Sequence, residues 1–155
     1  MKVKSKFNIE GFEISCRTCK ISDRTFILNL FKKTIFNYIS KYNDLSIKMF
    51  DERFYSDYKE KKILLKDSRK IGMFQLSERN NRLAITGLFL SKTYQGKGIA
   101  KHLMNYFEEV AKIKNYSEIE LLVWDNNPAK NFYKKIGYKI DSKKDHKYLM
   151  IKSLK

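Results

Sequence analysis

The chain has 155 residues, 43% of them hydrophobic, which fits a single domain over residues 1–155 and excludes an intrinsically disordered protein. Lysine and arginine number 33 against 17 acidic residues, and the resulting formal charge of +16 at pH 7 attracts polyanions such as nucleic acid, an anionic cofactor or an acidic protein surface. No apolar run is long enough for a membrane span, and the first residues lack the apolar stretch of a secretory signal. We therefore expect a cytoplasmic protein without a membrane partner.

The first part of the chain predicts a strand or hairpin and then two helices. Residues 7–20 alternate between polar and apolar side chains on either side of Gly11, as in a hairpin. In residues 22–42 and again in 46–60, apolar side chains recur at the spacing of one helix face.

Beyond residue 60 the apolar period changes to that of strands. Strands are expected at 61–67, 70–79, 83–90 and 117–125, with two more joined by a polar turn within 138–154, and helices at 99–114 and 126–138. The order β α α β β β α β α β β predicts a mixed α/β domain with helices on the faces of one sheet. Gly87 interrupts the largely apolar strand 83–90, which indicates a bulge there.

The two cysteines form a single CxxC, Cys16 and Cys19. A zinc site needs a second pair or nearby histidines, and the two histidines, His102 and His146, are far away in sequence. We interpret the pair as reduced thiols and expect no metal. A redox pair or half of an intersubunit metal site stays open as an alternative.

The most informative stretch is the loop 93–100, with the sequence TYQGKGIA. It joins a strand directly to a helix whose N-terminus has no Ser, Thr or Asp to cap it, so backbone N–H groups there are free and the helix dipole adds positive charge. Glycines let a backbone approach an anion closely, and Lys97 and Lys101 add charge. The loop matches neither nucleotide-binding pattern, GxxxxGK[ST] or GxGxxG, so by itself it indicates either a turn or a phosphate site.

The wider pattern resembles a known family. The residues Gln95-x-x-Gly98-x-Ala100 match the Q/R-x-x-G-x-G/A motif of the GNAT superfamily of acetyl-CoA-dependent N-acetyltransferases. The stretch LLVWDNNPAKNFYKKIGY is similar to the second signature of that family, carried by Asn126, Ala129, Phe132, Tyr133, Gly137 and Tyr138. The strong match covers about 83–138. It implies a mostly antiparallel central sheet flanked by helices on both faces, with strands 83–90 and 117–125 splayed apart for acetyl-CoA.

The resemblance also implies a set of acetyl-CoA-binding residues and one catalytic residue. The pyrophosphate would bind the loop, the pantetheine arm the backbone of strand 83–90, and the thiolate that leaves would take a proton or hydrogen bond from Tyr133. Taken alone, Tyr133 is more typical of a core aromatic side chain, and Asn126 of a turn residue. The expected cofactor-binding residues are Leu88, Phe89, Leu90, Gln95, Gly96, Lys97, Gly98, Ile99, Ala100, Asn126, Ala129 and Tyr133. A backbone N–H near Phe89 is expected to stabilise the oxyanion.

The chain departs from the family at the general base. Many relatives carry a glutamate on the strand before the motif, whereas this chain has no carboxylate in residues 84–87. Glu118, Glu120 and Asp125 on the next strand are alternatives, although they also fit solvent-facing strand positions. The base is therefore left unassigned.

The function implied is transfer of an acetyl group from acetyl-CoA to a primary amine by direct attack in a ternary complex. The acceptor is open between a small amine, a polyamine and a protein N-terminus or lysine. Alternatives are an acetyltransferase directed at tRNA or the ribosome, and a catalytically degenerate protein that binds CoA or RNA. The acceptor pocket is expected from residues 22–60 and 141–147, where the acidic residues are either a local face for a cationic amine or solvated: Asp44, Asp51, Glu52, Asp57 and Glu60. Monomer and homodimer both stay open.

Overall fold

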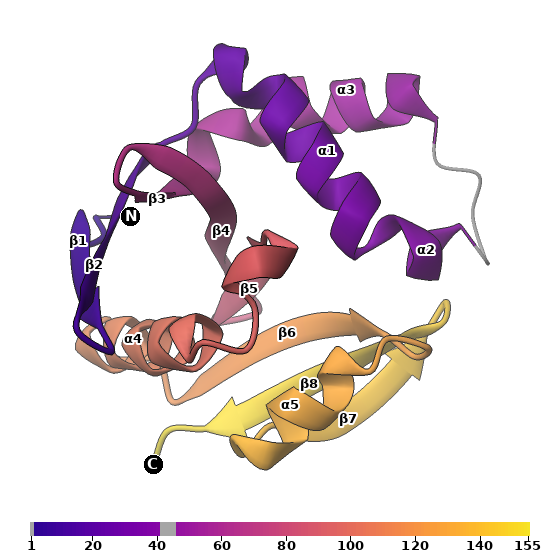
Figure 1. Cartoon of the computed structure of the whole chain (residues 1–155). Coiled ribbons are helices and arrows are strands. Elements are labelled where there is room, and N and C mark those ends of the chain that lie inside the picture. The colour runs from indigo at the N-terminus through magenta and orange to yellow at the C-terminus, as the bar shows by residue number, and fades with distance from the viewer. Residues whose placement is uncertain (1, 41–45) are drawn as a thin grey trace.

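The computed structural model describes residues 2–40 and 46–155, and its strands form one eight-stranded sheet in the order β1-β2-β3-β4-β5-β6-β8-β7 (Figure 1). Every pair of neighbours in that order is antiparallel except β5 and β6, which are parallel. The strands are β1 (Lys6–Ile9), β2 (Phe12–Thr18), β3 (Lys61–Lys66), β4 (Arg69–Arg79), β5 (Arg82–Leu90), β6 (Glu118–Trp124), β7 (Lys139–Lys144) and β8 (Lys147–Ser153). The predicted mixed, mostly antiparallel sheet is confirmed.

Helices cover both faces of the sheet, as predicted. They are α1 (Arg24–Thr34), α2 (Phe36–Ile39), α3 (Ile47–Asp57), α4 (Ile99–Ile113) and α5 (Ala129–Lys135). The α4 side chains pack with Phe74 of β4 in the larger core cluster, which α5 also joins, whereas α1 and α3 pack with Met73 in a smaller cluster. Because neighbouring residues of a strand point to opposite faces, Met73 and Phe74 mark the two sides of the sheet.

The prediction of one continuous helix over 22–42 is wrong. A 3₁₀ turn precedes α1, and the chain breaks at Ile35, which has φ −116°, before the short helix α2. The Thr34 hydroxyl donates to the Leu30 carbonyl at 2.8 Å, a local bond that competes with the helix ladder at this end. Residues 41 and 42 lie outside the described part of the chain.

The parallel strands β5 and β6 separate after a short paired stretch. Only Leu83, Ala84 and Ile85 pair with β6, opposite Ile119, Glu120 and Leu121. Beyond Ile85, β5 stays with β4, and a register shift in that pairing leaves Thr86 as the extra residue of a bulge. The predicted splay and bulge are confirmed, but the extra residue is Thr86, not Gly87, whose φ lies outside the left-handed region.

Candidate active site in the cleft between β5 and β6

The splay of β5 from β6 opens into a cleft of about 1180 Å³. One end reaches the loop before α4 at Gln95 and Gly96, and the lining continues past Ala129 and Tyr133 of α5. The other walls come from the apolar sides of α1, α2 and α3, for example Phe31 and Phe50. The cleft therefore connects the glycine loop with the helices of the first half of the chain.

The loop before α4 has the geometry of an anion site. Gly96 and Gly98 have φ values of 72° and 83°, a region that disfavours residues with a Cβ. Gly98 is the N-cap of α4 without a side-chain cap, and the first turn has no acidic residue. Within the described residues, the backbone N–H groups from Gly96 to Ala100 donate to no acceptor. A Cβ on Gly96 would meet nothing within 4 Å, so the loop is open above this residue.

Gln95 and the second half of β5 connect this loop to the cleft. The Gln95 side-chain Nε2 donates to the Leu90 carbonyl at 3.0 Å, which fixes the loop on the end of the strand. Leu88, Phe89 and Leu90 pair with β4 on one side, and beyond Ile85 the described residues supply no partner strand on the other. An unpaired strand edge is a surface on which an extended, amide-containing ligand can form backbone hydrogen bonds. Ile99 is part of the core, and Lys97 Nζ lies 5.9 Å from the Tyr94 ring centre.

Tyr133 lies in the cleft with a hydroxyl that stays protonated. Burial raises the pKa of Tyr133 to about 12, so at neutral pH its hydroxyl is a hydrogen-bond donor. The ring contacts Phe132 and Tyr138, with ring centres 5.4 and 6.1 Å apart. The helix spans Ala129–Lys135, which is shorter than the predicted 126–138, and the Asn127 side chain accepts from the Ala129 N–H at 2.9 Å at its start.

Asn126 lies in the turn after β6, next to the cleft-lining residue Asn127, and is not itself part of the lining. Its Nδ2 donates to the Tyr38 carbonyl of α2 at 3.4 Å, and its Oδ1 is buried with no hydrogen-bond partner among the described residues. A buried acceptor without a donor is costly, and its presence beside the cleft fits a ligand that supplies an N–H.

The three candidate carboxylates of the β6 region have different surroundings. Glu120 is 3% exposed and lines the cleft, so its interpretation as a solvent-facing strand residue is wrong. The Glu118 side chain is 40% exposed and pairs with Arg82. Asp125 forms an ion pair with Lys143 at 3.0 Å, and His146 Nδ1 lies 3.7 Å from the same carboxylate.

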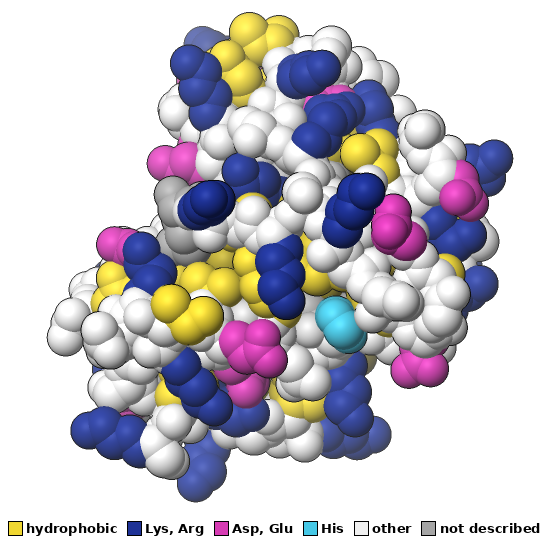
Figure 2. All heavy atoms as spheres, turned by 90° about the vertical axis from the view of Figure 1, so that its left-hand side faces the viewer, with side chains coloured by type: hydrophobic (Ala, Val, Ile, Leu, Met, Phe, Trp, Pro, Cys, Tyr) yellow, Lys and Arg dark blue, Asp and Glu magenta, His cyan; other side chains and the backbone are white. Residues whose placement is uncertain are grey.

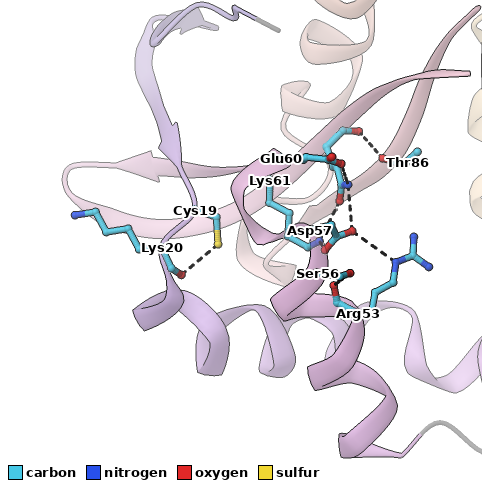
Figure 3. A network of polar contacts seen from close by, with 9 residues as sticks. Cys19, Lys20, Arg53, Ser56, Asp57, Glu60, Lys61 and Thr86 are labelled. Atoms are coloured by element: carbon cyan, nitrogen blue, oxygen red, sulfur yellow. Dashed lines mark hydrogen bonds and ion pairs between the residues drawn. The ribbon is translucent and has the colours of Figure 1, made fainter.

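A buried polar network that the sequence analysis missed lies on the α3 side of the cleft (Figure 3). Lys61 Nζ contacts Asp57 Oδ1 at 2.5 Å and Gln75 Oε1 at 3.1 Å, while Gln75 Nε2 donates to Glu60 and Asp57. Lys61 and Gln75 are direct partners in the β3–β4 ladder. The signal in the sequence is Gln75, a polar residue two positions from Met73 on the inward face of an apolar strand.

The predicted acidic face for a cationic amine does not form as a unit. Asp51 pairs with Arg24, and Asp57 and Glu60 belong to the network with Lys61. Glu52 is exposed, and Asp44 lies outside the described residues. The end of the cleft lined by α1, α2 and α3 therefore contains compensated charges and aromatic side chains.

The cysteines and the surface charge add no second site. Cys16 and Cys19 are free and buried, and burial raises the pKa of the Cys19 thiol to about 11, so it is an inert thiol at neutral pH. No three metal-ligating side chains come together in the ranges 2–40 and 46–155. On the face shown in Figure 2, Lys and Arg are spread out with Asp and Glu between them. No helix in the described ranges has the length and apolarity of a membrane span.

A sheet opened between two parallel strands, with an uncapped helix N-terminus at the opening, defines an α/β domain with a ligand cleft at the splay. Residues 26–138 match the Acetyltransferase (GNAT) family, and the chain belongs to that family of acetyl-transferring enzymes. The expected family membership is confirmed.

Solved structures show the same fold. The PaiA N-acetyltransferase from Thermoplasma acidophilum, in complex with coenzyme A, has 22% identity and a TM-score of 0.69 over 90% of this chain and 98% of that one. An N-acetyltransferase from Staphylococcus aureus Mu50 has 18% identity and a TM-score of 0.66 over 92% and 99%. N-acetylglutamate synthase from Neisseria gonorrhoeae, complexed with coenzyme A and N-acetyl-glutamate, matches at 16% identity and a TM-score of 0.68 over 92% of this chain but only 35% of that one.

Proposed function

We propose that residues 1–155 act as one domain that transfers the acetyl group of acetyl-CoA to a primary amine. The observation that carries the proposal is the row of free N–H groups from Gly96 to Ala100 at the same cleft as the protonated hydroxyl of Tyr133. Family membership supports acetyl transfer, and the CoA complexes of the PaiA enzyme and of N-acetylglutamate synthase support the choice of donor.

The residues present fit acetyl-CoA. The loop N–H groups would hold the pyrophosphate, because a helix N-terminus with positive-φ glycines offers several donors and partial positive charge to one anion. The free edge of β5 at Leu88, Phe89 and Leu90 would hold the amide groups of the pantetheine arm, together with the unpartnered Oδ1 of Asn126. When bound, acetyl-CoA supplies the thioester carbonyl that the amine attacks.

Two groups of this chain would act on the reacting atoms. A backbone N–H near Phe89, on the unpaired edge of β5, would donate to the oxygen on which negative charge develops. The Tyr133 hydroxyl would donate to the sulfur as the C–S bond breaks, and its pKa of about 12 keeps the proton in place for that role over the working pH range.

Two measurements test the proposal. Acetyl-CoA is expected to raise the melting temperature, and a panel of amines comprising spermidine, free amino acids and peptides with free N-termini is expected to include one that releases free CoA. Desulfo-CoA controls for binding without a thioester. A protein that acetyl-CoA does not stabilise even at millimolar concentration is not this enzyme.

The second candidate function is acetylation of an acceptor on tRNA or the ribosome, motivated by the charge of +16. Adding tRNA or ribosomes to the acceptor panel tests it. Binding through phosphates should weaken steeply as the salt concentration rises.

A further inference from the structure

The structure brings one carboxylate to the start of the splay between β5 and β6. Glu120 pairs with Ala84 in the last stretch where the two strands are joined. Their neighbours Leu83, Ile85, Ile119 and Leu121 all point into the core beneath α4, so Ala84 and Glu120 point to the opposite face, and both line the cleft. Ala84 is the first residue of the stretch 84–87 in which this chain lacks the carboxylate that many relatives carry. Glu120 therefore places a carboxylate beside this stretch, from the neighbouring strand.

Glu120 is held firmly but keeps a free oxygen. Arg82 Nη1 donates to Glu120 Oε2 at 3.1 Å, and Arg82 Nε donates to Glu118 Oε1 at 2.9 Å. One guanidinium thus serves two carboxylates, and the group of three retains one negative charge. Within the described chain, Glu120 Oε1 accepts no hydrogen bond and is not among the buried polar atoms without a partner.

The other carboxylates near the cleft are compensated more fully. Asp57 contacts Lys61, Gln75 and Arg53 at once, the last at 3.6 Å. Asp125 forms an ion pair with Lys143, and His146 lies 3.7 Å from it. Six cationic side chains line the same cleft: Lys33, Arg53, Lys61, Arg79, Lys92 and Lys147. Of these, Arg53 and Lys61 pair with Asp57. Glu120 is therefore the cleft-lining carboxylate that keeps an oxygen without a hydrogen bond among the described residues.

We propose that Glu120 is the general base that removes a proton from the acceptor amine, directly or through one water molecule. This inference rests on the amine acetylation proposed above. The ammonium gives one proton to Glu120, and the freed lone pair forms the C–N bond while the C–S bond breaks. The departing sulfur takes the proton of the Tyr133 hydroxyl, the second N–H proton restores that hydroxyl, and Glu120 releases its proton to solvent. The products are the amide, CoA thiol and one proton.

The test compares Glu120→Gln with the matched control Glu118→Gln, both of which keep a hydrogen-bonding partner for Arg82. We expect Glu120→Gln to lower kcat by ~10²-fold or more with an unchanged Kd for acetyl-CoA, and Glu118→Gln, which leaves the Glu120 carboxylate in place, to lower kcat far less. The loss should shrink for an acceptor of low basicity, which is already neutral and needs no base. A merely structural role of Glu120 does not depend on the basicity of the acceptor.

A second variant adds a gain of activity, which a folding defect cannot imitate. In Glu120→Gln/Ala84→Glu, a carboxylate returns on the neighbouring strand, and part of the lost kcat should return with it. Wild-type turnover that Glu120→Gln leaves intact overturns the role of Glu120 alone. A wild-type protein that binds acetyl-CoA but acetylates no amine overturns the proposed function, and the base with it.

Discussion

Asn126 and Tyr38, which are 88 positions apart in the chain, are joined by a hydrogen bond from the Asn126 Nδ2 to the Tyr38 carbonyl at 3.4 Å. The bond connects helix α2 with the turn between β6 and α5. The other end of the same amide, Oδ1, is buried without a partner. The Asn126 side chain therefore connects α2 with the turn after β6, and its Oδ1 is free to accept a hydrogen bond.

Asn126→Ala is expected to change stability and binding in different ways. The long bond to Tyr38 contributes little, and removal of the unpartnered Oδ1 offsets its loss, so the melting temperature should stay close to that of the wild type. If Oδ1 accepts an N–H of the pantetheine arm, the Kd for acetyl-CoA should rise by about fivefold to tenfold, as for loss of one hydrogen bond. Calorimetric titration measures the Kd. A clear loss of stability with unchanged Kd contradicts the assignment.

Gly96→Ala and Gly11→Ala form a matched pair. Both glycines have positive φ, 72° and 84°, and in both places a Cβ would meet nothing within 4 Å, so each substitution should cost about 1–2 kcal/mol of backbone strain. Gly11 lies in the β1–β2 turn, whereas Gly96 lines the cleft. Only Gly96→Ala should also weaken acetyl-CoA binding, measured by titration at a temperature where both variants are folded. Equal Kd values for the two variants would show that the loop does not hold the pyrophosphate.

Tyr133→Phe should separate turnover from binding. Without the hydroxyl, kcat is expected to fall by ~10² while the Kd for acetyl-CoA stays similar. Because the pKa of Tyr133 is raised to about 12, this hydroxyl should produce no loss of rate on the alkaline side below about pH 11. Steady-state kinetics with the best amine of the panel provide the measurement.

Tyr138→Phe is the control for that variant. The Tyr138 hydroxyl is buried without a partner in the described structure, so its removal should leave kcat unchanged and stabilise the fold by about 1 kcal/mol. Equal losses of kcat in the two variants would assign Tyr133 to the core instead of the reaction.

Asp23 should make the fold sensitive to acid. Its side chain is buried, and the hydrogen bond from Arg17, with further ones from Lys70 and the Lys20 N–H, lowers the pKa of the carboxyl far below its ordinary value. A carboxyl with a lowered folded-state pKa contributes stability that is fully present above its unfolded pKa, about 4, and is lost as the pH falls below it.

Asp23→Asn is therefore expected to cost about 2–3 kcal/mol at pH 7 and progressively less below about pH 4. Urea unfolding at several pH values measures the difference, and Asp67→Asn, at an exposed turn residue, is the control. A cost that does not depend on pH contradicts the linkage.

Several features of the fold and site could be predicted because their causes are local. The loop glycines and the uncapped start of α4 depend on residues next to one another, and so do the strand and helix periods. The break at Ile35 was missed because the apolar stripe continues through it, while the competing bond from Thr34 does not alter that stripe. The bulge was predicted at Gly87 but is formed by Thr86, because register depends on the partner strand β4.

The sequence by itself determined the order of elements, the glycine loop at the start of α4, and the position of Tyr133 on the helix that follows β6. Only the tertiary structure decided which charged side chains meet in the cleft. It paired Glu120 with Ala84, buried a carboxylate that reads as solvent-facing, and assembled Lys61, Gln75 and Asp57 beneath the acceptor-side helices. The physical reason is that a side chain's burial and compensating charge come from residues distant in the chain, which strand pairing brings together and no local pattern encodes.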